Sequence, residues 1–291
     1  MKRSLVLSGG GAKGSFQYGA IRYLWDEGCD FDHIYGVSVG SLNGAMVAQG
    51  DVEKLGHLWA SISNEKVYTG GLKLWSLVKV LFGQRSFYSN KPLQGMISEY
   101  IDPRRMKVPF RAGTVEMCTG AWRLWDVNNM DVYAARKAIL ASTAIPIIWE
   151  PVYLQGEQVD GGVRTQTPLM AAMEDGADEI IVVLCNPEVG ITQTNRNKLK
   201  DVLGIAERTV DILSNEIAVE EVQQALRINR MVIQAEEHGV ALYNRKGRLY
   251  KYIPIKLIAP EYPLQDALDF SHERVVKSIN YGRYMAKQVM G

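Results

Sequence analysis

Short apolar runs alternate along this chain with longer segments in which apolar residues recur every three or four positions. A short apolar run is typical of a buried strand, and the longer period is typical of a helix. The pattern predicts strands at residues 4–7, 33–35, 110–119, 121–127, 179–185 and 252–258, with a hairpin at 151–159. It predicts helices at residues 16–27, 41–46, 51–62, 91–101, 131–142, 167–174 and 271–290, and one or two helices at 199–235. Asp51 is expected to cap the helix at 51–62, and Pro168 is expected at the first position of the helix at 167–174.

The chain opens with a strand, a helix, a second strand and a second helix, an order that predicts a parallel sheet. No internal repeat, low-complexity segment or clear linker divides it, so we expect a single domain over residues 1–291. The polar segment 187–197 is the most boundary-like stretch, and we expect a mobile loop there. Residues 72–82 are apolar almost all round, which is usual for a buried helix.

Composition narrows the class of protein. With 291 residues, 47% of them hydrophobic and 22% charged, the chain can bury a sizeable core, and its net charge of +1 gives no support for a nucleic-acid partner. Cys29, Cys118 and Cys185 show no disulfide or metal-site spacing and suit a reducing compartment. No apolar stretch approaches the ~18 residues of a spanning helix, and the glycines at 9–11 interrupt the N-terminal run. We therefore expect a cytoplasmic protein that is soluble or attached to a membrane surface.

The most informative stretch is Gly36-Val37-Ser38-Val39-Gly40, which lies between a predicted strand and a predicted helix. A serine with glycines two residues before and after it is, in this context, the pattern of a nucleophile elbow. The tight turn strains the backbone of the serine, and side chains at the glycine positions would collide with the strand and the helix. The hydroxyl of Ser38 would project beside the positive end of the helix, which suits attack on an acyl carbon.

A glycine-rich segment, Gly9-Gly10-Gly11-Ala12-Lys13-Gly14, follows the first strand and has several interpretations. It satisfies the G-x-G-x-x-G dinucleotide fingerprint, but Asp30 and Asp32 precede the second strand, whereas that motif needs an acid at the end of the strand. It departs from the P-loop because glycine follows Lys13. As an oxyanion hole, its consecutive amides would donate to a developing alkoxide. The remaining interpretation is a tight turn without chemistry, and Lys13 would either hold the loop or face a phosphate.

A serine hydroxyl needs a base, and two kinds of candidate are present. The four histidines are His33, His57, His238 and His272. Only the last two have the chain order of an α/β-hydrolase triad, and neither follows a strand in a recognisable loop. The other candidate is Asp160, which ends a predicted strand before Gly161 and Gly162. A partly desolvated aspartate there can take the serine proton directly, because burial raises its pKa; an ordinary Asp-Gly turn is the alternative.

Taken in order, the glycine-rich loop, the Ser38 elbow and the Asp160-Gly161-Gly162 segment resemble the motifs of the patatin-like phospholipases. Three further segments are also similar to the family: residues 141–146 (ASTAIP), residues 90–93 (NKPL), and residues 269–271 (DFS) with the Tyr281-Gly282 pair in the helix that follows. The resemblance covers nearly the whole chain. The combination is specific to the family, although no single part of it is.

The resemblance implies a three-layer α/β/α sandwich with a mostly parallel central sheet, and a Ser–Asp dyad without histidine. Ser38 would be the nucleophile and Asp160 the base, and the oxyanion hole would be formed by the amides of Gly10, Gly11 and Ala12. The supporting residues would be Gly9, Lys13, Gly14, Gly36, Gly40, Gly161 and Gly162. Lys13 stands where the family often has arginine, and the segment 164–168 lacks the asparagine that the family commonly has before proline.

The implied reaction is hydrolysis of fatty-acyl esters of phospholipids or lysophospholipids through an acyl-enzyme, with no metal and no other cofactor. We expect a lid-like helical segment around residues 66–101, in which residues 72–82 are buried or dock on lipid. The expected partners are a lipid ester and, transiently, a membrane surface, with no nucleic acid and no prediction of oligomeric state. Two other functions stay open: a non-catalytic nucleotide- or lipid-binding module, and an α/β-hydrolase-type esterase with a histidine triad.

Overall fold

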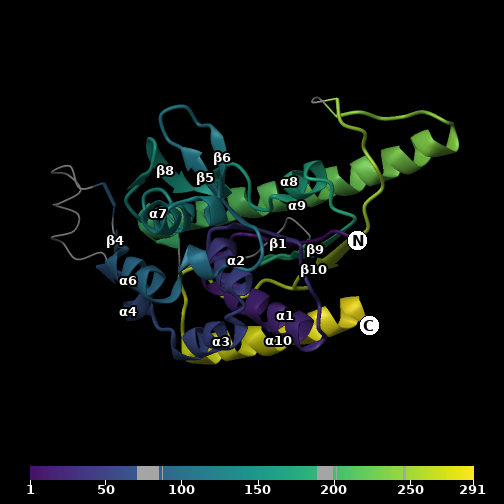
Figure 1. Cartoon of the computed structure of the whole chain (residues 1–291). Helices are drawn as coiled ribbons and strands as arrows, with labels where there is room; N and C mark the ends of the chain where they lie inside the picture. Colours follow the sequence, from purple (N-terminus) through teal and green to yellow (C-terminus); the bar gives the residue numbers. More distant parts are fainter. Residues whose placement is uncertain (71–84, 87, 189–198, 201, 245–246) are drawn as a thin grey trace.

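A sheet of eight strands forms the centre of the computed structural model, which describes residues 1–70, 85–86, 88–188, 199–200, 202–244 and 247–291 (Figure 1). The strands of this sheet are β1 (Arg3–Leu7), β2 (His33–Val37), β5 (Phe110–Glu116), β6 (Trp122–Asp126), β7 (Val152–Tyr153), β8 (Glu157–Asp160), β9 (Glu179–Val183) and β10 (Ile255–Ile258). Their order is β10-β9-β1-β2-β5-β8-β7, with β6 paired to β5. The strands from β10 to β5 are parallel, whereas β6, β7 and β8 pair antiparallel.

Helices connect these strands. The α-helices are α1 (Gly14–Asp26), α2 (Val39–Gln49), α3 (Val52–Ser61), α4 (Asn64–Val67), α6 (Lys91–Tyr100), α7 (Val132–Ser142), α8 (Leu169–Glu174), α9 (Val202–Glu237) and α10 (His272–Met290). Short 3₁₀ turns lie at η1 (Gly11–Lys13), η2 (Pro103–Arg105), η3 (Val127–Asn129) and η4 (Gly161–Val163). A separate two-stranded pair consists of β3 (Thr69–Gly70) and β4 (Tyr88–Ser89).

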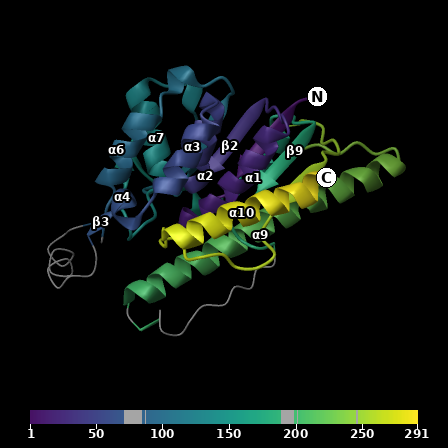
Figure 2. The same ribbon diagram turned by 90° about the horizontal axis from the view of Figure 1, so that it is seen from below.

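Alternate side chains along each strand point to opposite faces of the sheet, so each face packs against its own helical layer. Leu5 and Leu7 belong to a buried cluster with residues of α1, α2, α3 and α10, whereas Val6 and Tyr35 belong to a second cluster with residues of α8 and α9. Figure 1 shows these two layers on opposite sides of the sheet, and Figure 2 shows α1, α3 and α10 side by side. The predicted three-layer α/β/α sandwich with a mostly parallel sheet is therefore confirmed.

The strand β5 brings two other strands end to end. Its first residues pair with the parallel β2, as far as Gly113 opposite Val37. Its next residues pair with the antiparallel β8, beginning with Thr114 opposite Asp160. Because β6 pairs with both parts of β5, β2 and β8 lie on the edge of β5 that faces away from β6. The C-terminal ends of β2 and β8 consequently meet at the middle of β5.

Several predicted details differ in the structure. Asp51 precedes α3, but its carboxylate does not cap the helix and instead accepts a hydrogen bond from Gln49 and pairs with Arg105. Pro168 lies one residue before α8 and not at its first position. Residues 202–237 form one helix, α9. The predicted helix at 72–82 and most of the predicted loop at 187–197 lie outside the described residues.

Among the described residues, no helix combines the length and the apolar composition that crossing a membrane requires.

Glycines allow α1 and α10 to pack in close contact. A Cβ atom at Gly282 would lie 1.9 Å from the carbonyl oxygen of Phe16, and one at Gly19 would lie 1.9 Å from that of Ile279. Phe16 also contacts the ring of Tyr281 edge to face at 5.5 Å between ring centroids. This contact fixes the C-terminal helix against the helix that follows the glycine-rich loop.

We expect Gly282→Ala to lower the free energy of unfolding by about 1–3 kcal/mol, because the added methyl group must push α10 away from α1. Gly95→Ala is a matched control, because Gly95 is exposed in α6 and nothing lies within 4 Å of its Cβ position. Alanine favours a helix over glycine by up to about 1 kcal/mol, so this variant should be as stable as wild type or more stable. Urea unfolding measures both, and a Gly282→Ala protein of wild-type stability would contradict the close packing.

Candidate active site

Ser38 forms the turn between β2 and α2, and it is 5% exposed. Its backbone is in a region that non-glycine residues rarely adopt, with φ 55° and ψ −127°. A Cβ at Gly36 would lie 2.3 Å from the carbonyl oxygen of Gly40, and one at Gly40 would lie 2.4 Å from that of Leu7. The amide of Ser38 donates to Ser142 Oγ at 3.0 Å. The strained turn is therefore held by close packing and by a hydrogen bond from the end of α7, as an elbow requires.

Asp160 ends β8 beside this turn, and it is 3% exposed. Its Oδ1 accepts a hydrogen bond from the amide of Gly162 at 2.7 Å, whereas Oδ2 accepts none from the described part of the chain. Burial raises the pKa of Asp160 to about 7, while the nearby Ser38 hydroxyl and the Gly162 amide act to lower it. At neutral pH Asp160 is therefore ionised in a large fraction of the molecules, and the ionised carboxylate can accept a proton from the Ser38 hydroxyl.

Gly161 allows β8 to end against β5. A Cβ at Gly161 would lie 2.6 Å from the carbonyl oxygen of Gly113, and one at Gly162 would lie 3.0 Å from Asp160 Oδ1. Both glycines are buried in the turn η4. A larger residue at either position would move the Asp160 carboxyl away from Ser38.

The glycine-rich loop lies against the same turn. A Cβ at Gly9 would lie 3.2 Å from Ser38 Cβ, and one at Gly14 would lie 2.3 Å from the side chain of Val39. Gly11 has a positive φ of 57° and, like Ser38, lines an apolar pocket. The loop thus approaches Ser38 closely enough for its amides to face a group bound there.

The amides of the loop are not equivalent. Ala12 donates its amide to the carbonyl of Ala267 at 2.7 Å. Within the described ranges, the amides of Gly10 and Gly11 donate to no protein acceptor. In this conformation an oxyanion hole would have the amides of Gly10 and Gly11, but not that of Ala12, although the resemblance to the family implied all three.

Lys13 is 6% exposed and holds the loop from the other side. Its Nζ donates to Asn186 Oδ1 and to Asp211 Oδ1, both at 2.7 Å. Of the two roles considered for Lys13, holding the loop is therefore the one that these contacts favour. The dinucleotide interpretation gains no support either, since Asp32 accepts the amide of Arg3 at 2.7 Å, before β2 and not at its end.

An apolar pocket opens beside Ser38. Its empty space is about 790 Å³, including the part that is open to solvent. The pocket lies between α2, α3, α6 and the segment after α7, and its lining residues include Ser38, Val39, Leu42, Trp59, Leu93, Ile97, Ile145, Trp149 and Phe270. Almost all of its lining atoms are apolar. A pocket of this kind accommodates a hydrocarbon chain attached to a group at Ser38.

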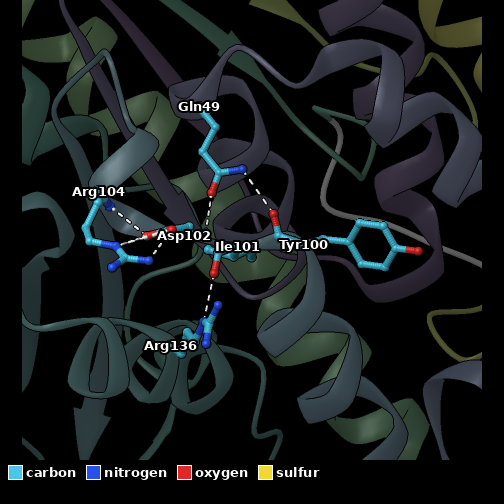
Figure 3. Close-up of polar contacts among 6 residues, drawn as sticks. All are labelled: Gln49, Tyr100, Ile101, Asp102, Arg104 and Arg136. Atoms are coloured by element: carbon cyan, nitrogen blue, oxygen red, sulfur yellow. Dashed lines mark hydrogen bonds and ion pairs between the residues drawn. The ribbon is translucent and has the colours of Figure 1, made fainter.

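The helix α6, which forms one wall of this pocket, is held at its end by polar contacts (Figure 3). The Gln49 side chain at the end of α2 donates to the carbonyl of Tyr100 at 3.1 Å and accepts the amide of Asp102 at 2.6 Å. Arg136 of α7 donates to the carbonyl of Ile101 at 2.8 Å. The side chain of Gln49 therefore links α2, which begins directly after Ser38, to α6, which forms a wall of the pocket.

The four histidines, all within the described residues, do not line this pocket. His33 lies at the opposite end of β2 from Ser38, and His57, His238 and His272 are exposed. The histidine-triad interpretation therefore gains no support from the geometry. Among the described residues, no group of three or more histidine, cysteine, aspartate or glutamate side chains could hold a metal ion.

Three side chains, those of Ser142, Asp211 and Glu221, contact the site although no sequence motif predicted a role for them. Ser142 was noted only as part of the family-like segment 141–146, although its hydroxyl accepts the Ser38 amide. Asp211 and Glu221 of α9 hold the glycine-rich loop and the segment after Asp160. No local motif marks these two residues, because acidic side chains on a long helix usually face solvent.

The comparisons with known proteins agree with this fold and these motifs. The model of the patatin-like phospholipase family matches residues 5–173, which include Ser38 and Asp160. The chain therefore belongs to the patatin-like phospholipase family.

Individual relatives are distant and differ in length. Uncharacterized protein YqhO of Bacillus subtilis is 24% identical over an alignment of 206 residues, which covers 62% of this chain and 70% of that protein. An uncharacterized NTE family protein of Mycobacterium tuberculosis is 24% identical over 184 residues, 63% of this chain and 49% of that protein. Patatin-like phospholipase domain-containing protein 7 of Rattus norvegicus is 26% identical over 188 residues, which are 62% of this chain and 13% of that protein. This chain thus matches about half or less of the two longer relatives.

Among solved structures, VipD from Legionella pneumophila has a similar fold. The comparison covers 99% of this chain and 66% of VipD, with a TM-score of 0.52 and 12% sequence identity. At this identity the likeness concerns the fold alone.

We expect the Asp160 carboxyl to make the folded protein less stable as the pH rises. An unfolded aspartate has a pKa of about 3.9, whereas that of Asp160 is about 7. Between these values only the folded protein retains the proton, so the free energy of unfolding falls as the pH rises from about 4 to about 7. Asp160→Asn cannot titrate, so its stability relative to wild type should increase over this range and then level off.

Urea unfolding at a series of pH values measures this difference. Asp102→Asn is the control, because Arg104 holds the pKa of folded Asp102 down to about 2, so the contribution of this carboxyl to stability changes only below about pH 5. The difference between wild type and Asp102→Asn should therefore stay flat above about pH 5. A flat difference for Asp160→Asn as well would mean that Asp160 has an ordinary pKa.

Proposed function

We propose that this protein is a serine lipid acyl hydrolase in which Ser38 is the nucleophile and Asp160 the base. The observation that carries the proposal is the meeting of a strained serine elbow and a buried carboxyl beside an apolar pocket. A nucleophile, a base and a binding space for a hydrocarbon chain are the three parts that hydrolysis of a lipid ester needs. Membership of the patatin-like phospholipase family supports the same class of reaction.

In the first half of the proposed reaction, Ser38 Oγ forms a bond to the acyl carbon while Asp160 takes the hydroxyl proton. The carbonyl oxygen becomes an oxyanion, to which the amides of Gly10 and Gly11 donate. The bond to the alcohol then breaks, and the departing alcohol takes the proton from Asp160. The acyl group remains esterified to Ser38.

In the second half, a water molecule attacks the acyl carbon and gives a proton to Asp160. The bond to Ser38 Oγ breaks, Ser38 regains its proton from Asp160, and the fatty acid leaves. Asp160 can serve both halves because burial raises its pKa to about 7, so that it gives and takes protons at neutral pH. The positive end of α2 stabilises negative charge near Ser38 in both halves.

The pocket and the family support a lipid substrate. The pocket accommodates an acyl chain, and each methylene that it removes from water contributes about 0.8 kcal/mol to binding. We propose phospholipids or lysophospholipids as substrates, taken from a membrane surface that the protein contacts transiently. Three residues of the expected lid-like segment 66–101 line the pocket: Val67 at the end of α4, and Leu93 and Ile97 of α6.

A non-catalytic binding module is the rival interpretation. For nucleotide binding, Lys13 would be the side chain that faces a phosphate, whereas it is buried and bonded to Asn186 and Asp211. Lipid binding without turnover would use the same pocket as the hydrolase. A test of Ser38 as a nucleophile is therefore needed to distinguish a lipid-binding module from a lipid hydrolase.

Ser38→Ala is expected to abolish reaction with a fluorophosphonate probe and to lower hydrolysis of a nitrophenyl fatty-acid ester by at least about a thousandfold. The reason is that, in the part of the chain that the structure describes, no other hydroxyl side chain belongs to a residue with a positive φ. Ser61→Ala is the control, because its hydroxyl is exposed and donates to the carbonyl of Leu58 in its own helix. Mass spectrometry of the labelled peptides identifies the residue. If Ser38→Ala hydrolysed the ester as fast as wild type, the proposal would be wrong.

Leu42→Trp is expected to shorten the acyl chain that the enzyme accepts. Leu42 lines the pocket one helical turn beyond Ser38, so a larger side chain there fills the space that a long chain needs. We expect kcat/KM for a decanoyl ester to fall about tenfold or more, with that for an acetyl ester nearly unchanged. Leu42→Met conserves the volume and should keep the wild-type preference. An equal loss on both esters would place the acyl chain outside this pocket.

A further inference from the structure

Two carboxylates of α9 contact the two loops that form the candidate site. The first is Asp211, whose Oδ1 accepts a hydrogen bond from the buried Lys13 of the glycine-rich loop, and whose Oδ2 pairs with Arg208. A buried ammonium group needs an anionic partner, because its desolvation is otherwise costly. The position of Lys13, and of the loop that carries it, therefore depends on α9.

The second carboxylate is Glu221, which holds the segment that follows the Asp160 turn. Its Oε2 accepts the amide of Gln166 at 3.0 Å and that of Thr167 at 2.6 Å. Two amides that converge on one oxygen define both the position and the direction of the backbone there. The contact therefore fixes the stretch only six residues after Asp160.

Gln166 joins this segment to the glycine-rich loop. Its carbonyl accepts the amide of Gly9 at 3.1 Å. Its side chain packs between the loops, since a Cβ at Gly9 would lie 2.1 Å from Gln166 Oε1 and one at Gly162 would lie 2.5 Å from Gln166 Nε2. A displacement of Gln166 would therefore shift both the glycine-rich loop and the turn that follows Asp160.

The helix α9 is itself firmly placed. Its buried face consists of Asn215, Ala218, Val222, Ala225, Asn229 and Val232. Val222 and Ala225 pack in the cluster on one face of the sheet, and Asn229 exchanges hydrogen bonds of 2.7 and 3.1 Å with the backbone of Ile253. Both carboxylates therefore project from a rigid support.

We propose that Asp211 and Glu221 are positioning residues, which hold the glycine-rich loop and the Asp160 segment in the arrangement that the reaction at Ser38 needs. This rests on the proposed function. Both residues lie beyond residue 173, where the match to the family model ends. Neither residue lines the apolar pocket, and neither does any other described residue of α9. Their substitution should therefore change the chemical step and leave binding of the acyl chain unaffected.

Glu221 offers a sharp test with a conservative variant. Burial raises the pKa of its carboxyl to about 8, so at neutral pH it is mostly uncharged. Glutamine keeps an acceptor oxygen for the two amides, so Glu221→Gln should retain most of the activity. Glu221→Leu removes the acceptor, and we expect kcat to fall about 10- to 100-fold, because small misplacements of reacting groups have effects of this size. KM should stay within about twofold of wild type, since the pocket is unchanged.

Glu220→Leu is the matched control for Glu221→Leu. Glu220 is the preceding residue of the same helix, and its exposed carboxylate pairs with Arg227. This variant should turn over and react with the fluorophosphonate probe at wild-type rates. Thermal unfolding of each variant gives the folded fraction under assay conditions, and kcat is expressed per folded molecule.

The Lys13–Asp211 pair is tested by a double-mutant cycle. If Lys13→Met and Asp211→Leu act through the same contact, the double variant should lose no more activity than the more affected single variant. Additive losses would mean that the two residues act separately and would overturn the role assigned to Asp211.

The outcomes separate the two proposals. Failure of the wild-type protein to react at Ser38 would overturn the proposed function and the positioning role together. Reaction at Ser38 in the wild type, with Glu221→Leu turning over at the wild-type kcat per folded molecule, would overturn the positioning role of Glu221 alone. A rise in KM without a fall in kcat would also overturn it, because it would mean that Glu221 supports the acyl pocket.

Discussion

The register of β5 is the constraint on which the candidate site depends. Gly113 pairs with Val37 of β2 and Thr114 with Asp160 of β8, so adjacent residues of one strand hold the two ends that carry Ser38 and Asp160. A slip of one residue in the pairing of β5 with β8 would turn the Asp160 carboxyl to the other face of the sheet. The junction has no room for side chains, since a Cβ at Gly113 would lie 2.0 Å from the Trp122 ring.

This arrangement stores strain and leaves polar groups unsatisfied. Ser38 has a disfavoured backbone conformation, and Asp160 Oδ2 and Gln166 Oε1 are buried without hydrogen-bond partners among the described residues. A buried polar atom without a partner costs about 1–3 kcal/mol, so the surrounding packing must offset these losses. Such features persist at functional sites because the rest of the fold imposes them. The same desolvation keeps the pKa of Asp160 near neutrality, so stability and proton transfer depend on one cause.

Much of this organisation could be predicted from the sequence, because it rests on local patterns. The parallel sheet follows from apolar runs that alternate with helical segments, and the elbow at Ser38 follows from glycines at fixed positions, whereas the three-layer sandwich was implied by the resemblance to a family. The meeting of Ser38 with Asp160 could be predicted only from the resemblance to a family, since no local rule joins residues so far apart in sequence. The capping role predicted for Asp51 was wrong because Gln49 and Arg105 compete for its carboxylate. Nothing in the sequence indicated that Ala267 accepts the Ala12 amide, because that contact depends on how the helical layers pack.

The glycine-rich loop is held from both helical layers, which makes its conformation a property of the whole fold. On one face of the sheet, Lys13 bonds to Asp211 of α9. On the other, Gln265 donates to the carbonyl of Ala12 at 3.0 Å and accepts from Ser278 of α10 at 2.6 Å. A loosening of either layer would therefore release one side of the loop and change the direction of the amides of Gly10 and Gly11. An oxyanion hole made of backbone amides depends on such contacts, because no side chain of its own can correct a displaced peptide group.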